Sequence, residues 1–129
     1  MASPAAAQDT DVTEPALIVE LNASETTDGA CRLSFLIRNE HSADIASAVY
    51  ETVLFNVEGA VQQLTLFDFG TLPSGRPRVR QFEVPNVTCD GLGSILINGA
   101  TTCDAGDLGA TVCTDTLVLR SRTEIEMLG

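Results

Sequence analysis

His41 is the only histidine in the chain, and histidine is the commonest general base at neutral pH. Ser42 and Asp44 follow it in the same polar stretch. A catalytic triad, however, needs a base held between a carboxylate and an activated serine, and sequence neighbours in one loop do not supply that geometry. The chain also lacks a G-x-S-x-G nucleophile elbow. We therefore interpret His41 as an exposed loop residue and predict a non-catalytic protein; a hydrolase with an unrecognised site is a third hypothesis.

The tripeptide Asp68-Phe69-Gly70 matches the magnesium-binding motif of protein kinases. A kinase also needs a strand lysine and a catalytic-loop H-R-D sequence, and this chain has no lysine at all. The tripeptide is therefore interpreted as the end of a strand, with no bound metal and no cofactor.

An acidic, glycine-rich stretch over residues 104–115 offers oxygen atoms that calcium prefers as ligands. Its candidate ligands are Asp104, Gly106, Asp107 and Asp115. Their spacing does not match the twelve-residue EF-hand loop, and such stretches are usually solvated turns. A small-molecule or calcium-binding carrier that uses this loop is the alternative function.

Arg76, Arg78 and Arg80 alternate along one segment, so a strand would project them to one face. Pro77 favours an edge strand, because proline cannot donate to a sheet ladder. Three aligned guanidinium groups suit a carboxylate or phosphate on a partner. The competing interpretation is internal pairing with some of the eighteen carboxylates.

The four cysteines contain no C-x-x-C pair, which argues against zinc-ribbon and thioredoxin sites. They are Cys31, Cys89, Cys103 and Cys113. An even number of cysteines favours disulfides formed in an oxidising compartment, although four buried thiols in a cytosolic protein remain the alternative. Three pairings are open to four cysteines.

The first residues are typical of the end of a secretory signal peptide. Ala5 and Ala7 are small residues at the positions that suit cleavage before Gln8, and an alanine-rich tail is the alternative interpretation. We expect residues 1–15 to be a disordered leader and residues 16–129 to be one domain. The predicted location is the periplasm or the extracellular space.

The net charge of −11 limits the partners of this protein. Its seven cations, all arginine, face eighteen anions, and nucleic-acid affinity depends on neutralising phosphates. We therefore expect no nucleic-acid binding. No apolar run reaches the length of a membrane helix, so no membrane insertion is expected.

Short alternating segments between turn signals indicate an all-β chain. The clearest segment carries Cys31, Leu33, Phe35 and Ile37 on one face. Strands are expected over about residues 17–22, 31–38, 49–57, 61–69, 78–84, 94–98 and 116–127. A helical turn is expected near 45–48 and a long loop over 99–114. About seven antiparallel strands at this spacing predict an immunoglobulin-like β-sandwich.

In such a sandwich the second and sixth strands lie in opposite sheets. Cys31 begins the expected second strand and Cys89 precedes the sixth, which favours a bridge between them. Cys103 and Cys113 would then close the loop before the last strand. The likeness to immunoglobulin domains ends there, because the chain has no tryptophan and Tyr50 lies in the wrong strand for a tyrosine corner.

A closer resemblance covers Leu17 to Gly129. The segments Tyr50–Phe55, Leu64–Gly70 and Gly75–Phe82 resemble a group of small exported proteins of alphaproteobacteria whose function is unknown. The resemblance implies a periplasmic location and gives no indication of an activity. Our leading hypothesis is a non-catalytic periplasmic module that binds another protein or an envelope component, with Arg76, Arg78 and Arg80 as the contact.

Overall fold

The computed structural model describes residues 14–129, so the predicted leader lies almost wholly outside the described residues. The described chain forms eight strands and three short helical segments. The strands are β1 (Leu17–Thr27), β2 (Ala30–Asn39), β3 (Ile45–Asn56), β4 (Val61–Leu72), β5 (Arg78–Val84), β6 (Leu92–Asp104), β7 (Leu117–Ser121) and β8 (Glu126–Leu128). The helical segments are η1 (Cys89–Gly91), η2 (Gly106–Leu108) and α2 (Val112–Asp115).

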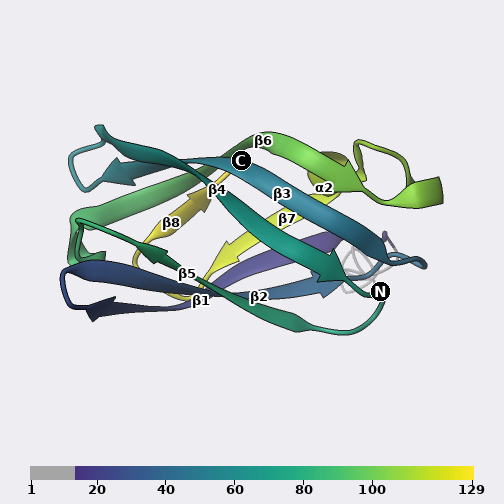
Figure 1. Ribbon diagram of the computed structural model, residues 1–129, viewed down its shortest axis with the longest axis horizontal. Coiled ribbons are helices and arrows are strands. Elements are labelled where there is room, and N and C mark those ends of the chain that lie inside the picture. The colour runs from purple at the N-terminus through teal and green to yellow at the C-terminus, as the bar shows by residue number, and fades with distance from the viewer. Residues whose placement is uncertain (1–13) are drawn as a thin grey trace, which may run out of the picture.

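Two four-stranded sheets pack face to face (Figure 1). We call the sheet with strand order β5-β2-β1-β7 sheet A, and the sheet with order β4-β3-β6-β8 sheet B. Each sheet is mixed, because β7 pairs parallel to β1 and β8 pairs parallel to β6. The prediction of an all-β sandwich is confirmed, with eight strands in place of about seven.

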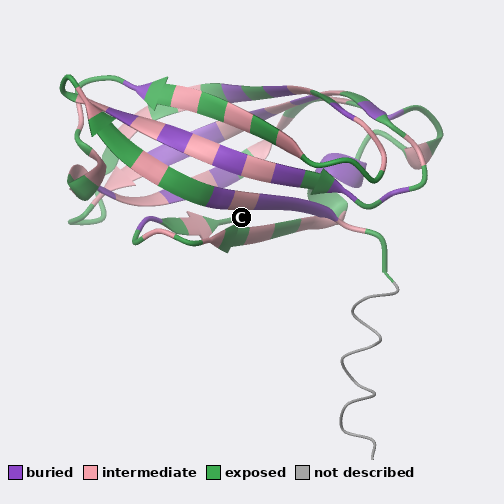
Figure 2. Cartoon of the chain, turned by 90° about the horizontal axis from the view of Figure 1, so that it is seen from below, coloured by how far each residue is buried: buried purple, intermediate pink, exposed green. Residues whose placement is uncertain are grey.

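Alternating burial along the strands places the core between the sheets (Figure 2). Leu33, Phe35 and Ile37 of β2 are fully buried, whereas the intervening residues reach the outer surface. This alternation follows from the two-residue period of a strand. Apolar burial of this kind contributes most of the stabilisation of a small domain.

Aromatic rings fill the core near the β4 and β5 side of the sandwich. Phe35 lies 5.6 Å from Phe67 and 5.6 Å from Phe69, and Phe67 stacks on Phe82 at 4.4 Å between ring centroids. Tyr50 joins the cluster through Phe69. These strands come from both sheets, so the cluster fixes their separation at this side.

The prediction of a helical turn near residues 45–48 is wrong. Ile45 begins β3 and pairs with Leu72, and Ala48 pairs with Gly70. Ile45 and Ala48 are completely buried in the core. Pairing with β4 and burial of these apolar side chains therefore override the weak local signal.

The prediction of a long loop over residues 99–114 is also partly wrong. Strand β6 continues to Asp104, because register shifts keep this segment paired with β3. Only residues 105–116 leave the sheet, where they form η2 and α2. The expected last strand is instead divided into β7 and β8, which belong to different sheets. In the turn between them, the Ser121 hydroxyl donates a hydrogen bond to the Ile125 carbonyl.

Both disulfides favoured by the strand assignment are present. Cys31 of β2 bonds Cys89 of η1, and Cys103 of β6 bonds Cys113 of α2. The first bridge joins sheet A to the segment that leads into β6 of sheet B, and the second anchors the excursion that follows β6. Two disulfides indicate an oxidising, exported environment.

The end of the chain departs from the immunoglobulin arrangement. In that fold the last strand lies beside the sixth in the sheet of the third and sixth strands. Here β7 crosses to sheet A and only the short β8 returns to β6. Sheet A therefore has β5 and β7 at its edges, and sheet B has β4 and β8.

Candidate interaction surface

His41 is buried, which corrects its assignment as an exposed loop residue. The side chain is 8% exposed, and Nε2 lies 2.9 Å from the Thr116 hydroxyl. Its main-chain N–H donates to the Asn39 side chain at 2.9 Å. The imidazole thus joins the loop after β2 to the residue that precedes β7. These contacts account for the burial of His41.

Among residues 14–129, the structure does not bring a serine, His41 and a carboxylate into a triad. The Asp44 carboxylate accepts a hydrogen bond from the main-chain N–H of Ser74 at 2.8 Å, so it caps a turn. Ser42 is exposed in the same loop. The hydroxyl that meets the imidazole belongs to Thr116, which itself donates to the Val112 carbonyl at 2.7 Å.

The acidic residues proposed as calcium ligands are spread over separate elements. Asp104 ends β6, Asp107 lies in η2 and Asp115 ends α2. In the part of the chain that the structure describes, no three histidine, cysteine, aspartate or glutamate side chains gather into a metal-binding group. The geometry therefore gives no support to a calcium site formed by the 104–115 loop.

The three candidate arginines have different environments. Arg80 reaches across to sheet B, where Nε donates to the Phe69 carbonyl at 2.7 Å and a terminal nitrogen donates to the Thr71 carbonyl at 2.9 Å. Arg78 donates to the carbonyl of Pro77, and Arg76 precedes the strand. β5 is an edge strand of sheet A, as the sequence predicted. The Arg80 side chain thus bridges β5 of sheet A and β4 of sheet B. Arg76 and Arg78 remain available for external contacts.

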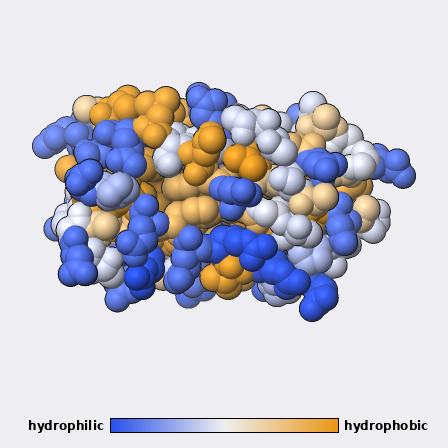
Figure 3. Space-filling model, viewed as in Figure 1, coloured by the Kyte–Doolittle hydropathy of each residue, from blue (hydrophilic) through white to orange (hydrophobic). Residues whose placement is uncertain are grey.

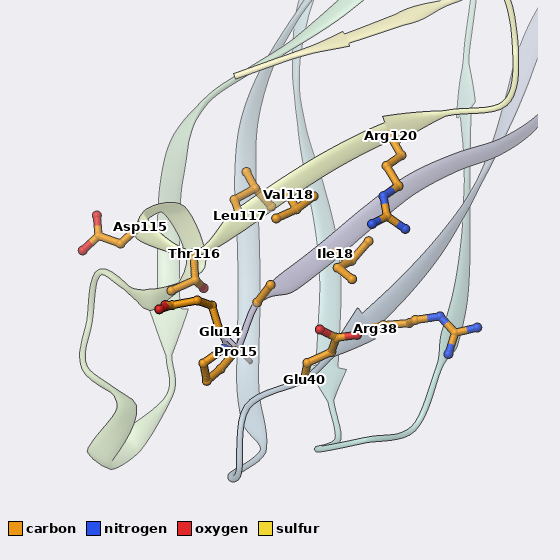
Figure 4. A pocket seen from close by; sticks show the side chains of 11 residues that line it. Glu14, Pro15, Ile18, Arg38, Glu40, Asp115, Thr116, Leu117, Val118 and Arg120 are labelled. Atoms are coloured by element: carbon orange, nitrogen blue, oxygen red, sulfur yellow. The ribbon is translucent and has the colours of Figure 1, made fainter. Parts of the chain in front are cut away.

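A groove of about 1000 Å³ crosses the outer face of sheet A (Figure 4). Ile18 and Val118 line its apolar part. Arg38 and Arg120 lie toward one end, and Asp115 lies toward the other. Neither guanidinium group pairs with a carboxylate within residues 14–129, where the ion pairs formed by arginine side chains involve Arg32. The groove combines a hydrophobic floor with two available cations and three carboxylates, which are those of Glu14, Glu40 and Asp115.

The outer face of sheet B exposes large apolar side chains. Backbone pairing aligns Leu64, Val53, Leu96 and Leu128 in one row across all four strands. A second row pairs Phe55 with Val61 beside the hairpin tip. We define the apolar patch by its exposed members, which are Val57, Val61, Leu64, Leu66 and Leu128.

The side chains of the apolar patch are highly exposed for large apolar residues. Leu64 is 62% exposed and Leu66 is 57% exposed, and Figure 3 shows apolar side chains gathered at the tip of the β3–β4 hairpin. Val53 is nearly covered, yet it lies outside the core cluster because its neighbours are the outer-face residues. Contiguous exposed apolar surface of this kind is characteristic of interaction sites.

The apolar patch was not predicted from the sequence. Along β4, Phe67 and Phe69 face inward and are buried. Leu64 and Leu66 belong to the opposite face of the same strand. Apolar residues in both alternating sets were the available signal, and they distinguish an interaction strand from an ordinary half-buried strand.

Comparison with known proteins gives no relative from which to infer function. No protein-family model matches the chain, and no curated protein or solved structure is significantly similar to it. Within residues 14–129, no helix is long and apolar enough to cross a membrane.

Proposed function

We propose that the protein is a non-catalytic periplasmic module that binds another protein or an envelope component through the apolar patch of sheet B. The observation that carries this proposal is the row of apolar residues across four strands, with Leu64 and Leu66 more than half exposed. Burying such side chains in an interface gains about 25 cal/mol for each Å² removed from water. The two disulfides support export.

The edge of sheet A provides the second part of the proposed contact. Arg76 and Arg78 lie on the β5 side of the sandwich, and β4 forms the adjacent edge of sheet B. Their guanidinium groups suit carboxylates on a part of the partner that extends beyond the apolar patch, past β4, to the edge of sheet A. Arg80 is excluded from this role because it bonds the carbonyls of Phe69 and Thr71.

Crosslinking capture from the exported fraction of the native host tests the proposal. The double variant Leu64→Ser/Leu66→Ser should lose the captured partner. Val79→Ser is the matched control, because Val79 is 61% exposed but lies on β5 of the other sheet. Equal capture by the patch variant and the wild type would refute the assignment of this surface.

A second candidate function is the binding of a small amphiphilic anion, which the groove on sheet A favours. Arg38 and Arg120 can hold a carboxylate or phosphate, and Ile18 and Val118 can hold an alkyl chain. This candidate uses the groove, whose lining includes Asp115 at the end of the 104–115 loop. Laurate should shift the NMR signals of the groove residues, whereas dodecyltrimethylammonium should not. No shift with laurate would exclude this candidate.

A further inference from the structure

The charges of this protein are segregated between its two sheets. Every one of the seven arginines lies on sheet A or in a segment next to it, namely Arg32, Arg38, Arg76, Arg78, Arg80, Arg120 and Arg122. β3, β4, β6 and β8 therefore carry no cationic side chain. The ion pairs of Arg32 with Glu25 and Glu83 also belong to sheet A.

Carboxylates are the only charged groups that the strands of sheet B place on its outer face. Glu51 pairs across the sheet with Leu66, and Asp68 follows Leu66 on the same face of β4. Glu126 pairs with Ser94 on β8 and β6, on the face that also holds Leu128. No described cation pairs with these three carboxylates. The apolar patch is thus bordered by acids that form no ion pair, and the Arg80 guanidinium, which reaches the edge of β4, bonds the carbonyls of Phe69 and Thr71.

We infer that the apolar patch recognises a protein surface in which apolar side chains are flanked by lysine or arginine. This inference rests on the proposed function and specifies the chemistry of its partner. A cationic rim would neutralise Glu51, Asp68 and Glu126 while the patch is buried, whereas an acidic rim would place like charges together. The same repulsion disfavours a second copy of this chain, because its sheet B carries the same acids.

The distribution of charge also disfavours partners with an acidic surface. Sheet A mixes Arg32, Arg38 and Arg120 with acids, so its outer face has no uniform sign. The strands of sheet B carry charged side chains of one sign only, and the net charge of −11 extends that negative potential beyond contact distance. Encounter with a cationic partner should therefore be accelerated and should slow as salt is added.

Titration of the full chain with two short peptides tests the inference. One alternates leucine and lysine, and the other alternates leucine and glutamate at the same length. The leucine–lysine peptide should shift the amide NMR signals of β3, β4 and β6. The leucine–glutamate peptide should leave them unchanged. Binding of both peptides, or of neither, would overturn the inference.

Variants that replace carboxylates with neutral amides test which sheet determines the preference for the leucine–lysine peptide. Glu51→Gln/Asp68→Asn/Glu126→Gln should weaken binding of the leucine–lysine peptide about tenfold, because three exposed pairs are lost. The amide introduced by Asp68→Asn can still accept the hydrogen bond that the Asp68 carboxylate accepts from the N–H of Gly70. The control Glu20→Gln/Glu25→Gln/Glu83→Gln removes the same charge from sheet A and should leave the affinity unchanged. Equal weakening in both variants would show a net-charge effect and contradict the inference.

Failure of the inference can be separated from failure of the proposed function. If the charge-neutral variant still captures the native partner while Leu64→Ser/Leu66→Ser does not, the surface is correct and its cationic specificity is wrong. If Leu64→Ser/Leu66→Ser captures the partner normally, the proposed function fails. Sedimentation equilibrium should show a monomer; a dimer abolished by Leu64→Ser/Leu66→Ser would assign the surface to a second copy and overturn the inference.

Discussion

The hydroxyl of Tyr50 donates a hydrogen bond to the main-chain carbonyl of Cys113, 2.8 Å away in the buried interior. Tyr50 belongs to β3 and Cys113 to α2, so the bond connects sheet B to the segment outside it. The Cys103–Cys113 disulfide ties the same residue to β6. α2 is therefore held covalently and by a buried hydrogen bond.

Replacing Tyr50 with Phe should lower the free energy of unfolding by about 1–2 kcal/mol, because the buried carbonyl of Cys113 loses its donor. The ring contact with Phe69 is retained, so the variant isolates the hydroxyl group. Urea unfolding followed by circular dichroism measures the change. An unchanged midpoint would show that the hydrogen bond contributes no net stability.

The protein should become less stable in strongly alkaline solution because Tyr50 is buried. Burial raises the pKa of the Tyr50 phenol well above its ordinary value of about 10. The unfolded chain loses this proton first, so the stabilisation is complete below about pH 10 and is lost as the pH rises through the folded-state pKa. Absorbance at the phenolate band should rise only together with unfolding. A phenolate signal from the folded protein near pH 10 would contradict the assignment.

The two disulfides should differ in their contribution to stability. Loop-closure entropy predicts a loss of about 4 kcal/mol for Cys31→Ser/Cys89→Ser and about 3 kcal/mol for Cys103→Ser/Cys113→Ser. The sequence separations that give this order are 58 and 10 residues. Thermal unfolding of both variants under oxidising conditions measures the order. A reversed order would mean that native packing outweighs chain entropy at these sites.

Replacing Arg80 with Met should destabilise the fold by about 1–2 kcal/mol, because the carbonyls of Phe69 and Thr71 lose charged donors. Arg78→Met is the matched control on the same strand face, and its stability should stay close to the wild type. Chemical denaturation compares the two variants. Similar losses would show that general removal of positive charge, and not the bridge to β4, is responsible.

Gly93 should tolerate no side chain. An added Cβ would lie 2.7 Å from the Asn56 carbonyl oxygen and 3.1 Å from the Val57 Cα. Gly93→Ala should therefore cost about 1–3 kcal/mol through forced backbone movement. Gly99 of the same strand has no atom within 4 Å of an added Cβ, so Gly99→Ala is the control. Equal stability of the two variants would show that the strand ends shift freely.

Much of the core was predictable because strand periodicity is local. The alternation of Leu33, Phe35 and Ile37 identified the inner face of β2. The disulfide pairing followed once Cys31 and Cys89 were placed at the same end of the sandwich. These inferences needed only residue type and the geometry of a strand.

The sequence did not predict which polar side chains are buried or which groups they bind. His41 is covered by packing against Thr116, and Arg80 is occupied by carbonyls of another sheet. Both contacts join residues that different strands bring together. The apolar patch also requires the register of four strands, because Leu64 and Leu128 become members of one row only through Val53 and Leu96.

The sequence by itself determined the class of fold and the residues able to form disulfides, since these depend on composition and short-range periodicity. The tertiary structure alone decided which apolar face stays exposed and where the cations lie relative to it. The physical reason is that a strand such as β4 carries large apolar residues on both of its faces. Only the packing of sheet A on sheet B decides which of them water reaches.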